Sequence, residues 1–521
     1  MQNRLNVLMV AAENDALPGG KVGGIGDVVR DVPPALAEEG CQVHVITPAY
    51  GSLARVSGAT KTTTIPVTFG GIGMGADVYT VPGKSAQEAV THWVVDHPAF
   101  SPWGEGRIYC DDGPDAPFAT DAGKFALFCQ LVANLIKEDA FGKLDVIHLH
   151  DWHAAPLLLL RRYHPDYKFL QRTCCVFSVH NLALQGIRPL QDDWSSLEAW
   201  FPGMIVDDVV TDPRWPECIN LMRAGITLAE KVHVVSPSYA REILQPSCVQ
   251  ERGYFGGEGL QLDLQRAEES GRLFGILNGC DYPERETATR LRRPQLAALM
   301  NEQVWRWIGS ETQLAAANFI AEKRIAQFAA RKEQLLITSV GRITDQKIRL
   351  LQQETPDGKV ALHALLEKLG VKGTYLFLGS GDEQLEQFLT ATAAHYDNFI
   401  FLRGYSDVVA EALYHSGHLF LMPSSFEPCG IGQMLAMRAG QPCLVHRIGG
   451  LNDTVEDGFN GFTFAGDSPQ EQAQQLVNSF ATALQCKQRR PQEWKKIASA
   501  AAQARFTWKS SIDKYLAELY N

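Results

Sequence analysis

Short apolar runs separated by amphipathic stretches recur along the whole chain, and this alternation limits the folds that it can adopt. Strand-length runs rich in Val, Ile and Leu are typical of buried parallel strands, and helical stretches between them are typical of βαβ units. The runs lie at 6–12, 42–48, 144–149, 174–179 and 231–235 in the first half, and at 335–340, 373–378, 399–402, 418–422 and 442–445 in the second. We therefore expect an α/β fold with parallel sheets that helices cover on both faces.

The length of the chain predicts more than one domain, because 521 residues exceed what one hydrophobic core usually serves. The clearest boundary signal is the turn-rich sequence at 278–283, which an Arg-rich stretch follows. We expect an N-terminal domain over 1–280, a C-terminal domain over 281–500, and a helix within 501–521 that packs back on the N-terminal domain. Apolar residues at helical spacing support that helix: Trp508, Ile512, Tyr515, Leu516 and Leu519.

Composition argues against several classes of protein. The formal net charge of -11 disfavours a general nucleic-acid binder, which needs a basic surface. No apolar run reaches the roughly 18 to 20 residues that cross a bilayer, and the run at 6–12 is too short for a secretory signal. The eleven cysteines lack the spacing of a disulfide framework or a CxxC zinc site. We expect a cytoplasmic protein with reduced thiols and no membrane or nucleic-acid partner.

A glycine-rich turn follows the first expected strand. Residues 21–27 read Lys-Val-Gly-Gly-Ile-Gly-Asp, and small residues at such a turn let backbone N–H groups approach a phosphate or a sugar. The sequence is not the GxGxxG dinucleotide fingerprint. A tight turn that carries a surface lysine is an equally good interpretation of this motif alone.

Histidines gather at the ends of two neighbouring strands. His148, His150 and His153 lie at and after the end of one run, and strand alternation places the first two on the same face. His180 and Asn181 end the next run. A zinc site is one interpretation, but the spacing is not HExxH. Histidines that pack in the interior or face a substrate are the favoured interpretation.

Two further strand ends carry charged residues in the second half. Arg342 and Lys347 follow the run at 335–340, and two cations that converge on a diphosphate would neutralise the charge of a leaving group. A solvated polar loop is the alternative. Glu427 follows the run at 418–422, and the glycines after it predict a helix start whose amides suit a phosphate. Cys429 has no base beside it in the sequence and is expected to be a packed thiol.

Taken together and in order, these segments resemble the bacterial glycogen synthase and plant starch synthase family. The resemblance covers nearly the whole chain, and eight ordered matches are far more specific than any single motif. They lie at Lys21–Val28, His150–Ala154, Val179–Gly186, Val235–Glu242, Leu277–Asp281, Arg342–Lys347, Phe426–Gly430 and Gly449–Val455.

The resemblance implies a retaining glycosyltransferase with two Rossmann-like domains (the GT-B architecture) and a deep interdomain cleft. It implies that the C-terminal domain holds the nucleotide sugar and the N-terminal domain holds an α-glucan acceptor. Glucose would pass to the non-reducing end of an α-1,4-glucan with retention and without a metal ion or other cofactor. ADP-glucose is favoured over UDP-glucose because most bacterial members of the family use it.

The resemblance also implies roles for individual residues. Arg342 and Lys347 would hold the diphosphate, Glu427 would orient the donor glucose, and His180 would contact that sugar. Asp151 would lie toward the acceptor. The residues expected to bind the nucleotide sugar are Lys21, Gly23, Gly24, Asn181, Asn278, Cys429, Gly430, Ile431 and Gly432.

The chain departs from the family pattern around the expected phosphate-binding loops. Ile348 follows Lys347 where relatives have glycine, residues 352–359 look inserted, and Gly432 replaces Thr or Asn. These changes leave two alternatives open, namely UDP-glucose or a small acceptor as substrate and a catalytically silent glucan-binding paralogue. Retention of Arg342, Lys347 and Glu427 argues against a silent protein. A metal hydrolase built on the histidines is the third alternative.

Overall fold

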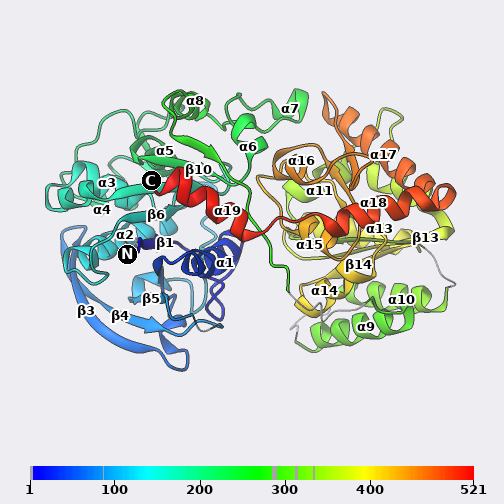
Figure 1. Ribbon diagram of the computed structural model, residues 1–521, viewed down its shortest axis with the longest axis horizontal. Coiled ribbons are helices and arrows are strands. Elements are labelled where there is room, and N and C mark those ends of the chain that lie inside the picture. Colours follow the sequence, from blue (N-terminus) through cyan, green and yellow to red (C-terminus); the bar gives the residue numbers. More distant parts are fainter. Residues whose placement is uncertain (1–3, 86, 284–289, 311–314, 332–334) are drawn as a thin grey trace. The chain divides into compact units, whose positions relative to one another are not determined.

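The computed structural model describes residues 4–85, 87–283, 290–310, 315–331 and 335–521 (Figure 1). The chain divides into two compact units. The first unit comprises Met1–Pro246, Gly256–Asn278 and Trp508–Asn521, and the second comprises Ser247–Phe255 and Gly279–Thr507. Each unit is built on a largely parallel sheet, so the predicted α/β class is confirmed.

The sheet of the first unit has nine strands in the order β11-β10-β7-β6-β1-β2-β5-β4-β3. All neighbours are parallel except the pairs β3/β4 and β4/β5, which are antiparallel. The strands are β1 Asn6–Val10, β2 Gln42–Pro48, β3 Thr60–Phe69, β4 Ile72–Val81, β5 Val90–Asp96, β6 Val146–His150, β7 Cys174–Val179, β10 Lys231–Val234 and β11 Leu273–Gly275. A two-stranded sheet joins β8 Ile187–Pro189 to β9 Cys218–Asn220.

Helices follow the strands of the first unit, as right-handed βαβ connections require. They are α1 Gly24–Glu38, α2 Ala119–Lys137, α3 Pro156–Tyr163, α4 Leu197–Trp200, α5 Leu221–Leu228, α6 Pro237–Glu242 and α8 Gln261–Glu269. Gly225 in α5 allows the helix to lie directly on β7, because a Cβ there would come within 2.1 Å of the Phe177 ring.

The last segment of the chain completes the core of the first unit. It forms α19 Trp508–Lys514 and a π-helical turn, Tyr515–Leu519, and its apolar residues pack with those of α1 and β1. Trp508 Nε1 donates a hydrogen bond to Asp31 at 3.2 Å. The Tyr520 hydroxyl lies 2.7 Å from His148 Nδ1 below the strand ends. The C-terminus therefore supports the part of the sheet that carries the histidines.

The second unit has an all-parallel sheet of six strands in the order β14-β13-β12-β15-β16-β17. The strands are β12 Leu335–Val340, β13 Gly373–Gly379, β14 Phe399–Arg403, β15 Leu419–Met422, β16 Cys443–His446 and β17 Gly461–Phe464. Hydrophobic clusters lie on both faces. All ten strands expected from the apolar runs are present, with ends shifted by at most two residues.

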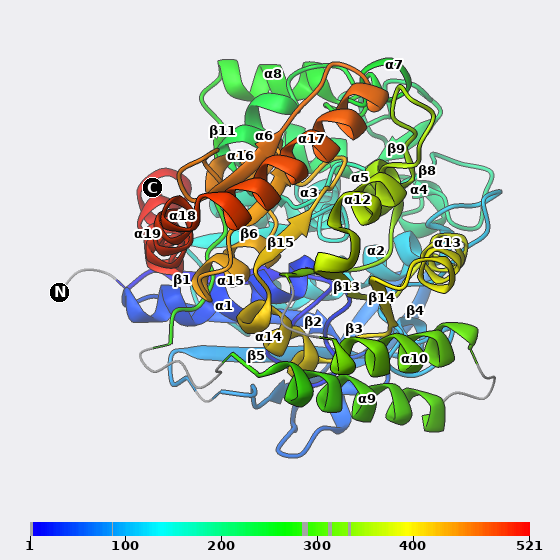
Figure 2. The same cartoon turned by 90° about the vertical axis from the view of Figure 1, so that its right-hand side faces the viewer.

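Helices cover both faces of this sheet, and Figure 2 looks onto this unit, with α9 and α10 side by side. The helices are α7 Val249–Arg252, α9 Arg293–Ser310, α10 Ala316–Ala330, α11 Asp345–Gln352, α12 Ala361–Leu369, α13 Glu383–His395, α14 Asp407–Ser416, α15 Gly432–Arg438, α16 Gly449–Thr454, α17 Pro469–Arg489 and α18 Pro491–Gln503. No helix in the described ranges is long and apolar enough to cross a membrane. All eleven cysteines are described, and each is a free thiol.

Candidate functional site

The candidate residues of the second unit lie beyond the carboxyl ends of two adjacent strands, β12 and β15. Arg342 follows β12, Lys347 lies in the first turn of α11, and Glu427 lies in the loop between β15 and α15. Ligands of open α/β sheets usually bind at this edge, because the loops there are free to vary above a fixed framework. The fold thus brings the three charged residues expected from the sequence to one edge.

Lys347 and Glu427 form an ion pair between their Nζ and Oε2 atoms. The Glu427 residue is only 8% exposed, and Ser424 Oγ donates a second hydrogen bond to the same carboxylate oxygen at 2.9 Å. A buried carboxylate needs such partners because unpaired burial of a charge is costly. The two charged groups therefore fix each other's position.

Hydrogen bonds to backbone groups hold the two loops together beside the ion pair. Gln346 Nε2 donates to the carbonyl of Phe426 at 2.9 Å, and the Ser425 N–H donates to the carbonyl of Gln346 at 2.8 Å. His446, at the end of β16, adds a 3.0 Å contact from Nδ1 to the Ser424 carbonyl. Each loop is thus anchored independently of the Lys347 side chain.

Arg342 differs from Lys347 because its side chain is exposed. Within the described part of the chain it forms no hydrogen bond or ion pair. Among the described residues, no carboxylate pairs with this guanidinium. It is therefore suited to bind an anion, because its five N–H donors have a fixed planar arrangement that matches the oxygens of a carboxylate or phosphate.

Glycines allow three loops to meet around Glu427. Gly430 has a positive φ of 76°, and Gly432 begins α15. Gly449 begins α16 with φ 42°, and a Cβ on it would lie 1.9 Å from the Glu427 carbonyl oxygen. Gly450 donates its N–H to that same oxygen at 3.1 Å. The sequence alone indicates no role for Gly449 and Gly450, although both lie in the matched motif Gly449–Val455.

The residues next to this loop have structural explanations. Cys429 is 5% exposed and packs as expected for a thiol, and Ile431 is the N-cap residue of α15. Ile348 is fully buried in the core beneath α11. Residues 352–359 end α11 in a turn closed by a 2.8 Å hydrogen bond from Thr355 N–H to the Lys359 carbonyl. The substitution at Ile348 thus adds core packing under the helix that carries Lys347.

In the first unit, a buried carboxylate organises the glycine-rich turn. Glu13 Oε2 accepts hydrogen bonds from the N–H groups of Val22 at 2.9 Å and Gly23 at 2.6 Å, and Glu13 Oε1 accepts one from the Tyr109 hydroxyl at 2.7 Å. The Gly23 N–H is therefore already engaged, whereas Gly24 begins α1. Glu13 was missed because one glutamate after a strand has no sequence signature.

Lys21 is engaged by carboxylates in the same turn. Its Nζ lies 2.5 Å from Asp27 Oδ1 and 3.9 Å from Asp15 Oδ2. Because the Lys21 side chain is 37% exposed, these contacts are screened by water and are weak. An incoming anion would have to displace or share them.

Asp151 follows β6 in a left-handed conformation, with φ 55°. Its Oδ1 accepts the His180 N–H at 2.7 Å, which joins the loops after β6 and β7. Burial raises the pKa of the Asp151 carboxyl to about 8, against the opposing effect of the N–H groups of His180 and Asn181. The carboxyl is therefore mainly protonated at neutral pH.

The histidines form a packed network beneath these loops. His150 Nδ1 lies 3.0 Å from His180 Nε2, and the rings of His148 and His150 stack with centroids 4.5 Å apart. The Ser178 hydroxyl lies 2.6 Å from His148 Nε2 and 2.7 Å from His233 Nδ1. Burial lowers the pKa of all four rings, which keeps them neutral. The prediction that His148 and His150 share a face is confirmed.

These neutral rings are bonded to one another and to hydroxyls rather than arranged around a common point. Among the described residues, no group of three His, Cys, Asp or Glu side chains has the geometry to hold a metal ion. His153 packs against the Phe125 ring with centroids 4.8 Å apart. The histidines are therefore packed in the interior, except that His180, which follows the end of β7, is partly exposed at this edge of the sheet.

Two amides expected at the site differ in their bonding. Asn181 Oδ1 accepts the Ala183 N–H at 3.0 Å and so shapes its own loop. Asn278 is 5% exposed, and its Oδ1 has no hydrogen-bond partner among the described residues. A buried amide oxygen without a partner is uncommon and is suited to accept a bond from a ligand or water.

Two family models match the chain. One is described as starch synthase catalytic domain and matches residues 6–266, and the other is described as glycosyl transferases group 1 and matches residues 334–481. Together they cover both sets of strand ends described above.

Full-length relatives are bacterial glycogen synthases. The protein from Streptococcus equi subsp. equi is 32% identical over 531 residues, which cover 99% of each chain. That from Gloeobacter violaceus is 32% identical over 99% of this chain and 98% of its own. That from Moorella thermoacetica is 30% identical over 99% of this chain and 96% of its own.

Solved structures support the fold. The catalytic domain of starch synthase IV from Arabidopsis thaliana, bound to ADP and acarbose, matches with a TM-score of 0.76 and 24% identity over 99% of each chain. Sucrose-phosphate synthase from Thermosynechococcus elongatus matches with a TM-score of 0.54 and 17% identity over 99% of this chain and 98% of its own.

The role of Asp151 in shaping its loop is testable by substitution. Asp151→Ala removes the acceptor of the His180 N–H and places alanine at positive φ, so we expect the free energy of unfolding to fall by about 2 to 4 kcal/mol. Asp151→Asn keeps an amide oxygen and tolerates this conformation, so the loss should stay below about 1 kcal/mol. Urea denaturation at pH 7 measures both changes.

The control is Asp139→Ala. Asp139 has nearly the same φ, 56°, but its side chain is exposed. The free energy of unfolding of this variant should fall only by the cost of alanine at positive φ, about 1 kcal/mol. Equal losses for the two alanine variants would show that the bond to His180 contributes nothing.

Proposed function

Because the chain belongs to the glycogen and starch synthase family, we propose that it transfers glucose from ADP-glucose to the non-reducing end of an α-1,4-glucan with retention of configuration. The family resemblance inferred from the ordered motifs is confirmed by the family models and the full-length relatives. The fold class with two Rossmann-like domains, the GT-B architecture, is confirmed by the sheets and the structural match. The donor, the acceptor and the stereochemistry are our proposals.

The observation that carries this proposal is the cluster of Arg342, Lys347 and Glu427 at one sheet edge. In the transfer, the bond between C1 of glucose and the diphosphate oxygen breaks, and its electron pair leaves with the diphosphate. Negative charge therefore grows on the leaving group in the transition state. Two cations that meet the diphosphate, of which Lys347 is held in place before the donor arrives, stabilise that charge more than they stabilise the ground state. The 4-hydroxyl oxygen of the acceptor forms the new bond to C1, and its proton passes to the departing diphosphate.

The Lys347–Glu427 ion pair supports a division of roles between the two cations. Lys347 is held by a buried carboxylate and by its place in the first turn of α11, so it is preorganised before the donor arrives. Arg342 makes no ion pair within the described ranges and is available to clamp the diphosphate. Glu427 retains a second carboxylate oxygen, which we propose accepts hydrogen bonds from hydroxyls of the donor glucose.

The loop around α15 supports binding of the nucleotide sugar through its backbone. Gly430, Ile431 and Gly432 carry N–H groups before and at the start of a helix, and such groups suit a phosphate. Cys429 would contribute only its main chain, because its side chain is buried. Gly432 in place of a larger residue leaves this approach open.

In the first unit, we propose that the strand ends after β6 and β7 meet the sugars. His180 and Asn181 would contact the transferred glucose, and Asp151 would lie toward the glucan. The protonated Asp151 carboxyl would then act as a hydrogen-bond donor rather than as a base. Lys21, Gly23 and Gly24 would add contacts to the diphosphate, and the partnerless Asn278 oxygen would accept a further bond.

One structural relative supports the choice of donor. Starch synthase IV from Arabidopsis thaliana was solved with ADP and acarbose, an adenine nucleotide and a sugar-like molecule. We propose ADP-glucose as the donor on this basis. We also propose a cytoplasmic location for the protein. A nucleic acid or a membrane is not a proposed partner.

Substitution of the two cations tests the proposed roles. Lys347→Ala and Arg342→Ala should each lower kcat about a hundred- to thousandfold, which corresponds to roughly 3 to 4 kcal/mol of transition-state stabilisation. The KM for glycogen should hardly change. Lys347→Arg should recover little, since a planar guanidinium does not reproduce a compact ammonium. Initial rates of labelled glucose transfer give these values.

The matched control is Lys359→Ala, which removes an exposed lysine of the same unit that pairs with Glu367. Its kcat should equal that of the parent protein. A folded Lys347→Ala variant with near-normal kcat would contradict the proposed role and revive the silent-paralogue or altered-mechanism alternatives.

The proposed mechanism also predicts independence from divalent metal ions. Arg342 and Lys347 supply the charge that a metal ion supplies in other transferases, so full activity is expected in excess EDTA. Transfer rates with EDTA, with added Mg²⁺ and with added Mn²⁺ provide the comparison. Loss of activity on chelation that either ion restores would count against the assignment.

A further inference from the structure

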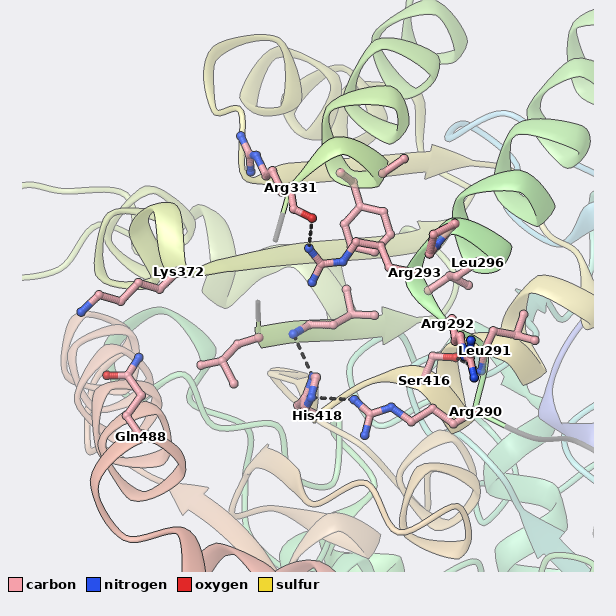
Figure 3. A pocket seen from close by; sticks show the side chains of 15 residues that line it. Arg290, Leu291, Arg292, Arg293, Leu296, Arg331, Lys372, Ser416, His418 and Gln488 are labelled. Atoms are coloured by element: carbon pink, nitrogen blue, oxygen red, sulfur yellow. Dashed lines mark hydrogen bonds between the residues drawn. The ribbon is translucent and has the colours of Figure 1, made fainter. Parts of the chain in front are cut away.

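A polar pocket lies in the second unit, at the amino ends of its strands (Figure 3). Its volume is about 1070 Å³, and its lining includes the first residues of β12 and the residues just before β13 and β15. The proposed donor residues follow the carboxyl ends of β12 and β15. Because β12 has six residues, the two sites are separated by about 16 Å of strand. The pocket is therefore distinct from the donor site.

The described lining of this pocket is strongly cationic. It contains Arg290, Arg292, Arg293, Arg331 and Lys372, and no carboxylate among the lining residues that the structure describes. The whole chain carries a net charge of -11, so this cluster is not a consequence of a basic composition. Figure 3 shows Arg290 and Arg293 extending toward the start of β12, with Arg331 and Lys372 farther out.

His418 lines this pocket beside Arg290 and has an incomplete hydrogen-bond arrangement. Its Nδ1 accepts the Leu336 N–H at 3.1 Å, so the neutral ring carries its proton on Nε2. Arg290 Nη2 lies 2.6 Å from that same Nε2. A guanidinium has no acceptor atom, so two N–H groups face each other without an acceptor between them.

Burial, together with the surrounding charges, keeps His418 neutral by lowering its pKa. Burial, followed by Arg290, Lys487 and Arg293, lowers the pKa of His418 to about 3. Arg293 is held in place by a 3.0 Å hydrogen bond to the Arg331 carbonyl and by the Phe328 ring 4.9 Å beneath its guanidinium. An oxyanion near Nε2 would accept bonds from both His418 and Arg290 and would offset the repulsion among the cations.

We propose that this pocket binds a small phosphorylated molecule that carries at least two phosphoryl groups. Arginine is suited to phosphate oxygens because its donors bind them in pairs, and several arginines within one pocket favour a multiply charged anion over a single phosphate. Apolar residues such as Leu291, Leu296 and Phe328 complete the lining. The volume lies just above the roughly 300 to 1,000 Å³ of most small-molecule sites, which leaves room for such a ligand. The site is independent of the proposed glucosyl transfer.

Calorimetric titration with inorganic pyrophosphate tests this assignment. The protein carries Arg342→Ala and Lys347→Ala, so that the proposed donor site contributes little to the signal. We expect one equivalent of pyrophosphate to bind. Adding Arg290→Gln should weaken this binding at least tenfold, because one charge-assisted contact and the donor beside His418 are lost. Adding Lys495→Gln, which removes an exposed lysine of α18 outside the pocket, should leave it unchanged.

Two further measurements keep the result unambiguous. Thermal unfolding of each variant checks that it is folded. If the Arg290→Gln variant does not fold, Arg292→Gln is used in its place. Sodium sulfate at equal ionic strength should compete poorly with pyrophosphate. Absence of binding at millimolar pyrophosphate, equal weakening by Lys495→Gln, or full competition by sulfate would overturn the proposal.

Discussion

The ion pair between Lys347 and Glu427 is the interaction on which the proposed donor site depends. The two residues are 80 positions apart and meet only because β12 and β15 are parallel neighbours whose carboxyl ends share an edge. The buried Glu427 carboxylate needs a cation, and Lys347 supplies it from the first turn of α11. Core packing of Ile348 beneath that turn holds the lysine above the edge. The position of the charged Lys347 side chain thus depends on the burial of the apolar residue next to it, Ile348.

A related arrangement occurs in the first unit, where buried carboxyl groups shape two loops. Glu13 accepts the N–H groups of the glycine-rich turn, and Asp151 accepts the N–H of His180. In both units the backbone at the strand ends is fixed by side chains before any ligand is present. Such preorganisation favours transition-state stabilisation, since less reorganisation accompanies the reaction.

The sequence predicted the fold class and all ten of the strands sought, because buried parallel strands are continuous apolar runs. Among the described residues it missed strands that are not continuous apolar runs of that length, namely β3, β4, β5, β8, β9, β11 and β17. The start of β3, for example, is the polar run Thr60 to Thr64. The sequence indicated that the charged candidates lie at strand ends, but it did not indicate which residues they contact. Glu13 and Ser424 act through contacts across the fold, which no local spacing encodes. The cationic pocket was also invisible, because its residues come from several separate segments that only the amino ends of the strands bring together.

We propose that these strand ends carry out retaining transfer of glucose to a glucan. The product made from ADP-glucose labelled with ¹³C at C1 of the glucose, with glycogen as the acceptor, can be analysed by nuclear magnetic resonance. We expect the label to enter the polymer as α-1,4-linked glucose. Label found only as free glucose, or in a β linkage, would contradict this proposal.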